Sequence, residues 1–145
     1  MEEERKSAYR EVVNAAAERV FAAKGSDGSR MSEIAAEAGI SLGTLYGVID
    51  GKESLFFGIH RTRMHEFLDC IRVARDAHDE TLASHLAVLR LGGQYFLERP
   101  DFLRMCCRDG YGWASGFPAS KSGTDLWNEG ASIPRDLFAR GIAEG

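Results

Sequence analysis

Residues 34–55 decide the fold, and they have the sequence IAAEAGISLGTLYGVIDGKESL. The apolar residues before Gly39 have helical spacing, and Gly39 stands where a left-handed residue ends a helix. Ser41 follows at a position where its hydroxyl can cap a second short helix over about residues 42–48. Two short helices joined by a tight turn predict a helix-turn-helix, an arrangement that many DNA-binding heads share.

The remainder of the chain continues this helical pattern. Asp50 as N-cap and Glu53 three residues later have the spacing of a capping box, which predicts the start of a long helix. The chain contains three prolines, and long runs with helical periodicity lie between them, so we expect an all-α fold. The predicted helices cover about residues 7–24, 31–38, 42–48, 52–75, 81–98, 100–106 and 125–142.

Apolar spacing also predicts which residues form the core. In the helix over 52–75 the expected buried stripe is Leu55, Phe56, Ile59, Met64, Phe67, Leu68, Ile71 and Ala74. In the helix over 81–98 the expected core residues are Leu82, Leu86, Leu89, Tyr95, Phe96 and Leu97.

The charged residues do not give the chain an overall positive charge. The 145 residues carry a net charge of −4, and residues 1–60 hold 7 Lys and Arg against 10 Asp and Glu, a balance of −3. A nucleic-acid-binding protein usually shows a basic patch, so any DNA contact must come from a local cluster. No signal peptide or long apolar segment is recognised, and we expect a cytoplasmic protein.

Motifs for catalysis and metal binding are not recognised in the sequence. We find no nucleophile–base set, no paired-carboxylate motif and no phosphate-binding glycine loop. The four histidines and the three cysteines lack metal-ligand spacing. We therefore expect neither an enzyme nor a bound cofactor or metal.

Residues 34–55, quoted above, resemble the tetracycline-repressor (TetR/AcrR) family of bacterial transcriptional regulators. The resemblance covers roughly residues 10–60. It implies a helix-turn-helix DNA-binding domain over residues 1–51 and a helical ligand-binding and dimerisation domain over residues 52–145 that ends early and looks incomplete. It further implies a homodimer that binds double-stranded operator DNA and responds to a small-molecule effector. The residues that carry it are Ala16, Ala17, Phe21, Gly25, Ile34, Ala35, the run from Ala38 to Tyr46, Lys52, Glu53 and Leu55.

Position by position, the resemblance implies a set of DNA contacts. Ser29 and Arg30, at the start of the second helix, would touch phosphate, and Lys52 would hold phosphate at the start of the long helix. The third helix would place Leu42, Gly43, Thr44 and Tyr46 at the major groove or its rim, with Ser41 as a further polar contact. For Gly43, close packing against the first helix is an equally weighted alternative.

Two departures from the family pattern concern the third helix and the residue after it. Leu42 stands where a basic residue is common, and Val48-Ile49 replaces an aromatic residue or histidine followed by Phe. The third helix is consequently uncharged, and we expect modest DNA affinity. The main hypothesis is a repressor that a small apolar or amphipathic ligand releases from DNA. The alternative is a helical ligand- or partner-binding protein of the same fold with weak or lost DNA binding.

Aromatic residues of the second domain are candidates for an apolar ligand pocket, with one histidine as its polar group. Each of them is also an ordinary core candidate. The candidate ligand-binding residues are Phe67, His85, Tyr95, Phe102, Tyr111, Trp113 and Trp127.

Overall fold

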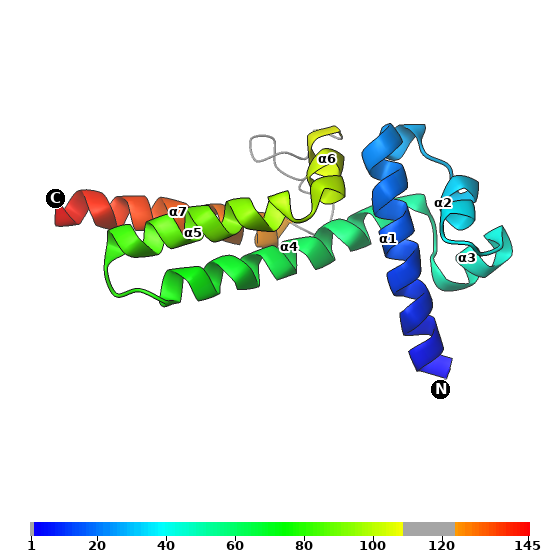
Figure 1. Cartoon of the computed structure of the whole chain (residues 1–145), viewed down its shortest axis with the longest axis horizontal. Coiled ribbons are helices and arrows are strands. Elements are labelled where there is room, and N and C mark those ends of the chain that lie inside the picture. The colour runs from blue at the N-terminus through cyan, green and yellow to red at the C-terminus, as the bar shows by residue number, and fades with distance from the viewer. Residues whose placement is uncertain (1, 109–123) are drawn as a thin grey trace. The chain divides into compact units, whose positions relative to one another are not determined.

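The computed structural model describes residues 2–108 and 124–145, and these residues form seven α-helices and no strand (Figure 1). Tyr111 and Trp113 lie outside the described residues, and so does the side chain of Trp127. The all-α prediction is confirmed. The helices are α1 (Glu2–Gly28), α2 (Met31–Glu37), α3 (Leu42–Val48), α4 (Lys52–Asp76), α5 (Thr81–Leu97), α6 (Pro100–Arg108) and α7 (Thr124–Glu144).

The described chain divides into two compact units. Unit 1 contains residues 2–59 and 101–108, and unit 2 contains residues 60–100 and 124–145. The first turns of α4 thus belong to unit 1 and the remainder of α4 to unit 2. The domain boundary predicted between residues 51 and 52 stays a prediction.

Unit 1 is a helical head with an aromatic pair in its core. The rings of Phe21 in α1 and Phe56 in α4 meet edge to face, with centroids 5.2 Å apart. Leu45 anchors α3 with no exposed surface. The first helix is longer than expected, but Gly25 interrupts it with φ 75° and ψ 168°, at the position where a helix end was predicted. Further buried residues are Val13, Ala16, Ala17, Ile34, Ala35, Leu55, Ile59, Phe102 and Met105.

Unit 2 packs α5 and α7 against α4. Small residues allow the close approach: a Cβ on Gly92 of α5 would stand 3.4 Å from the Phe67 ring, and one on Gly130 of α7 would stand 3.4 Å from Leu68. All eight residues of the predicted α4 stripe are buried. Pro134 lies inside a continuous α7.

Four of the six predicted core residues of α5 are exposed, so this prediction is largely wrong. Tyr95 and Phe96 are buried, but Leu82, Leu86, Leu89 and Leu97 are 54–78% exposed. The buried face instead carries Thr81, Ser84, His85, Val88 and Gly92. α5 has a single charged residue, Arg90, and apolar residues on both faces, so its periodicity does not identify the face that packs. The start of α4 at Lys52 is as predicted, but the residue directly before the helix is Gly51, so the prediction of Asp50 as N-cap is corrected.

One buried histidine makes unit 2 sensitive to acid. His60 of α4 is 2% exposed, and burial lowers its pKa from 6.5 to about 4 because the charged imidazolium loses its hydration. As the pH falls below 6.5, His60 takes up a proton in the unfolded chain but stays neutral in the folded chain down to about 4. Protonation therefore favours unfolding. The stability that is present above pH 6.5 is lost as the pH falls from 6.5 to about 4.

We expect His60 alone to lower the free energy of unfolding by about 3 kcal/mol between neutral pH and about pH 4. Urea unfolding at a series of pH values measures this loss. His60→Gln should remove that part of the pH dependence, whereas the same change at the exposed His65 should leave it in place. Equal pH dependence in the wild type and His60→Gln would show that His60 is not the group responsible.

Candidate nucleic-acid interface

The turn between α2 and α3 is fixed by backbone hydrogen bonds. The Gly39 N–H donates to Ala36 O at 3.1 Å and the Ile40 N–H donates to Ala35 O at 3.0 Å, which together form a Schellman motif. Gly39 has φ 69°, a left-handed conformation that favours glycine. These bonds set the direction in which α3 leaves the turn.

The start of α3 is capped as its sequence predicts. Ser41 Oγ accepts a hydrogen bond from the Thr44 N–H at 3.0 Å, and the Ser41 and Thr44 hydroxyls are 2.8 Å apart. Both side chains are exposed. The two hydroxyls are therefore held together at the N-terminal end of α3, where they are available to an external hydrogen-bonding partner.

The outward face of α3 is open. Leu42 is 42% exposed and Tyr46 is 54% exposed, while Leu45 between them points into the core. A Cβ on Gly43 would meet one atom within 4 Å, Ser41 Oγ at 3.8 Å, and a Cβ on Gly47 would meet nothing. Close packing of Gly43 against α1 is therefore not observed among the described residues. The face can receive another molecule without any rearrangement of unit 1.

The predicted phosphate contacts differ in their accessibility. Arg30 is exposed at the N-cap of α2, and its backbone N–H donates to the Glu33 carboxylate at 3.0 Å. Ser29 is 3% exposed, and its hydroxyl donates to Gly25 O at 2.5 Å. Lys52 Nζ donates to Ser29 O at 3.1 Å, which joins the start of α4 to the turn before α2. Arg30 is thus the accessible cation, whereas Ser29 mainly holds the turn.

Two further cations of unit 1 are paired within the protein. Arg19 Nε stands 2.6 Å from the Glu37 carboxylate, and Lys24 Nζ stands 2.5 Å from that of Glu33. The hydrogen bond from Lys24 and the one from the Arg30 N–H hold the pKa of Glu33 below its ordinary value. Sequence reasoning missed this role of Glu33, although its position three residues after the N-cap was a usable signal. Arg19 and Lys24 are therefore already engaged within unit 1.

Four of the predicted ligand-binding residues have described side chains, and they belong to two different units. Phe67 and Tyr95 are buried core residues of unit 2, and Phe102 is a buried core residue of unit 1. His85 alone among them lines a described groove, which lies between α5 and α7. The prediction of an aromatic pocket therefore stays untested for the residues outside the described part.

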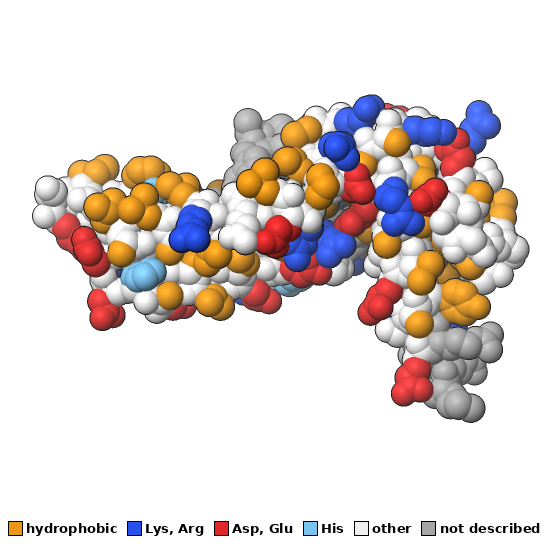
Figure 2. All heavy atoms as spheres, in the orientation of Figure 1, with side chains coloured by type: hydrophobic (Ala, Val, Ile, Leu, Met, Phe, Trp, Pro, Cys, Tyr) orange, Lys and Arg blue, Asp and Glu red, His pale blue; other side chains and the backbone are white. Residues whose placement is uncertain are grey.

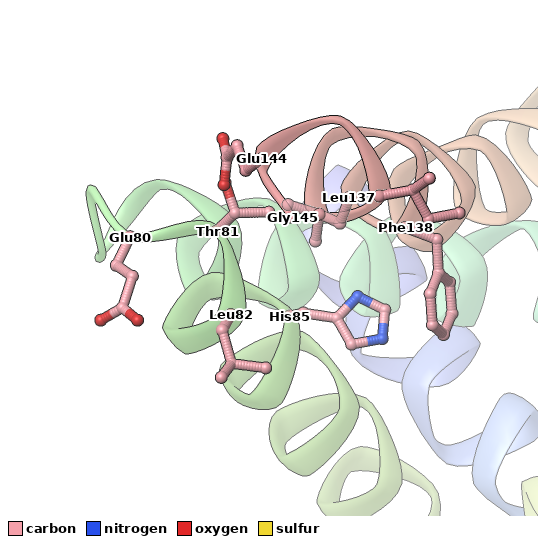
Figure 3. A pocket seen from close by; sticks show the side chains of 10 residues that line it. Glu80, Thr81, Leu82, His85, Leu137, Phe138, Glu144 and Gly145 are labelled. Carbon is pink, nitrogen blue, oxygen red and sulfur yellow. The ribbon is translucent and has the colours of Figure 1, made fainter.

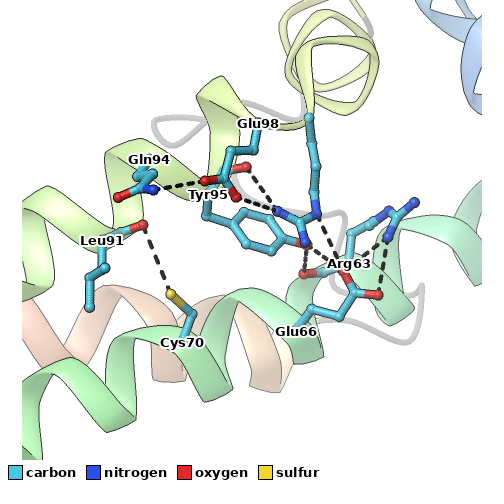
Figure 4. Close-up of polar contacts among 8 residues, drawn as sticks. Arg63, Glu66, Cys70, Leu91, Gln94, Tyr95 and Glu98 are labelled. Atoms are coloured by element: carbon cyan, nitrogen blue, oxygen red, sulfur yellow. Dashed lines mark hydrogen bonds and ion pairs between the residues drawn. The ribbon is translucent and has the colours of Figure 1, made fainter.

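Tyr95 belongs to a polar cluster that joins α4 to α5 (Figure 4). Its hydroxyl lies 2.8 Å from the Glu66 carboxylate and 2.9 Å from Arg63 O, and the Arg99 guanidinium lies 4.0 Å from the centre of its ring. Partial burial alone would raise the pKa of Glu66, but bonds from Arg63 and Tyr95 hold it below its ordinary value. Burial and the neighbouring carboxylate raise the pKa of Tyr95. The cluster was not predicted, because its contacts between α4 and α5 join Tyr95 to residues that are 32 and 29 positions away in the sequence.

The described residues show neither a metal-binding cluster nor a membrane-spanning helix. No group of three or more histidine, cysteine or acidic side chains there could hold a metal ion. None of the described helices is both long enough and apolar enough to span a bilayer.

Comparison with known proteins supports the geometry of the head. Residues 14–59 match the profile of bacterial regulatory proteins of the tetR family. Solved structures with the same fold include the TetR-family transcriptional regulator PfmR from Thermus thermophilus, with a TM-score of 0.74 and 21% identity. That match covers 92% of this chain and 71% of PfmR. A search of curated proteins found no match.

A second solved structure has the same fold. It is a protein from Shewanella sp. PV-4 assigned to the tetR family of transcription regulators, with a TM-score of 0.69 and 17% identity over 94% of this chain and 71% of that one. The profile match and the two solved structures agree with the helix-turn-helix geometry of α2 and α3. Residues 14–59 thus resemble the bacterial regulatory proteins of the tetR family, and the resemblance predicted from the sequence is confirmed.

Proposed function

We propose that the chain is a repressor that binds operator DNA through the outward face of α3 and leaves it when a small molecule binds unit 2. The observation that carries the proposal is the open α3 face, on which Leu42, Thr44 and Tyr46 are exposed around an anchored Leu45. Apolar contact from Leu42 suits a thymine methyl, and the two hydroxyl groups suit base edges or phosphate oxygens. As a dimer, two heads would enter successive major grooves about 34–36 Å apart.

A response to ligand requires two states of the protein that bind the ligand with different affinities. A ligand shifts the protein toward the non-binding state only if it binds that state more tightly. α4 is suited to transmit such a shift, because it contributes residues to both units and its start is bonded to the turn before α2 through Lys52 and Ser29. A change in α4 that breaks this bond would alter the region around Arg30.

A reporter gene under the promoter beside the chain's own gene tests repression. We expect reporter expression to rise when the gene for this chain is deleted and to fall when it is restored. Unchanged expression in both strains would contradict the proposal. Expression that falls on deletion would instead identify an activator.

The alternative of a regulator fold without useful DNA affinity rests on two observations. α3 carries no charge, and two cations of unit 1 are paired with glutamates. Under this alternative, substitutions on the α3 face and at Arg30 would leave reporter expression unchanged, although the purified protein would still bind ligand.

Arg30→Ala should weaken binding about equally for all DNA sequences, because a phosphate contact carries no sequence information. We expect the slope of log affinity against log salt to become shallower by about 0.9, the contribution of one released counterion. Titrations at several salt concentrations measure the slope. The matched control is Arg90→Ala, which removes an exposed arginine of α5 and should leave the slope unchanged. Identical slopes for the wild type and Arg30→Ala would remove Arg30 from the interface.

A further inference from the structure

A groove lies between the start of α5 and the end of α7 (Figure 3). Its volume is about 530 Å³, within the range of small-molecule sites. Its walls are mainly apolar and come from Leu82 of α5 and from Leu137, Phe138 and Ile142 of α7. Figure 2 shows hydrophobic side chains gathered over this part of α5 and α7. The groove can therefore accept a largely apolar body.

His85 is the unusual residue of the groove. Its side chain is more than nine-tenths buried, with 8% exposed, and neither ring nitrogen has a hydrogen-bond partner among the described residues. Buried polar groups in native proteins are nearly always paired, and one left unpaired is destabilising. A bound molecule that supplies the missing hydrogen-bond partner of the imidazole would therefore be stabilised by this bond.

Phe138 covers His85. The two ring centroids are 4.1 Å apart and the rings meet at 64° (Figure 3). Phe138 is itself 59% exposed, so its side chain can turn into solvent with little loss of packing. A ligand ring of similar size can then take its place against the imidazole and against Leu82.

The charges at the rim restrict the ligand further. Glu80 and Glu144 line the groove, and no lysine or arginine is among its lining residues. The Thr81 hydroxyl donates a hydrogen bond to Glu144 at 2.9 Å and accepts one from Arg140 at 3.2 Å. Glu144 and Arg140 are therefore both already bonded to Thr81. A carboxylate ligand would meet like charge, whereas an uncharged hydroxyl would not.

We infer that this groove binds a neutral, mainly apolar molecule that carries a hydroxyl group, such as an alkylphenol. The hydroxyl donates to a ring nitrogen of His85, and the apolar body covers Leu82, Phe138 and Ile142. The inference rests on the proposed function in that it names the chemical class of the effector. Binding to the DNA-free protein tests it separately from any effect on DNA.

Calorimetric titration of the DNA-free full chain with three probes tests the class of ligand. The probes are para-hexylphenol, its methyl ether, which cannot donate a hydrogen bond, and para-hexylbenzoate, which is anionic. We expect the phenol to bind roughly tenfold or more tightly than either of the others, as expected for one buried hydrogen bond. Equal binding of phenol and ether, preference for the benzoate, or no binding would overturn the inference.

The substitution His85→Phe tests the residue. In this variant the phenol and the ether should bind with equal affinity, whereas the matched change at the exposed His65 should preserve the preference. Circular dichroism establishes that each variant is folded, and the wild-type comparison of phenol with ether decides the class of ligand if His85→Phe does not fold. An unchanged preference in folded His85→Phe would overturn the role of His85.

Sedimentation of the same samples tests whether a second copy of the chain occupies the groove. We expect the phenol to bind with the same affinity at low and high protein concentration. Binding that disappears as the chain self-associates, and that Leu86→Glu, at an exposed residue of α5 outside the groove lining, restores by preventing association, would assign the face to a second copy and overturn the inference. Release of DNA by the phenol is a separate measurement, so a phenol that binds without releasing DNA would contradict the proposed function alone.

Discussion

Replacing Phe56 by alanine should unfold the DNA-binding head. Phe56 is 2% exposed, and its ring meets that of the fully buried Phe21 at 5.2 Å. Loss of a buried phenylalanine side chain typically costs about 3–5 kcal/mol, which is a large part of the stability of a domain of this size. DNA binding would be lost because α1 and α4 no longer support α3.

Urea unfolding followed by circular dichroism measures this effect. Phe138→Ala is the matched control, because Phe138 is 59% exposed and its loss should cost less than about 1 kcal/mol. If both variants lose stability equally, the Phe21–Phe56 pair does not hold unit 1 together.

Tyr46→Glu should abolish DNA binding without unfolding the protein. Tyr46 is 54% exposed on the outward face of α3, so the substitution changes little of the core. A carboxylate brought against phosphate costs several kcal/mol, which corresponds to a loss of roughly 100-fold or more in affinity. Fluorescence anisotropy with operator DNA measures the loss.

Two controls make the Tyr46 result specific. Leu97→Glu introduces the same charge at a residue of α5 that is 78% exposed, and it should retain most of the affinity. Tyr46→Phe keeps the ring and removes the hydroxyl, so it measures the hydrogen bond alone. Tyr46→Glu that binds DNA as the wild type does would show that this face of α3 does not meet DNA.

The sequence predicted most of the helical framework, because strong local signals and burial agreed there. The bounds of α3 and all eight buried residues of the α4 stripe were predicted. Gly39 and Ser41 act as predicted, since a left-handed residue and an N-cap hydroxyl are local features of the backbone. These are the elements that position the candidate interface.

Features that depend on distant partners were not predictable in the same way. Leu82 and Leu86 have the spacing of a core stripe, yet α5 packs through Val88 and Gly92 because small residues allow closer contact with α4. Ser29 was expected at phosphate, but its burial under the turn follows from tertiary packing. His85 was a candidate from its residue type alone, and only the structure shows its unpaired ring nitrogens against the groove.

The most direct test of the central claim is an anisotropy titration of the full chain with labelled DNA from the promoter beside its own gene, against a scrambled duplex of equal length and composition. The titration is done at low salt, where few phosphate contacts suffice for binding. The account predicts that the promoter DNA binds about a thousandfold or more tightly than the scrambled duplex. Equal binding of the two duplexes, or no binding by a protein that circular dichroism shows to be folded, would contradict it.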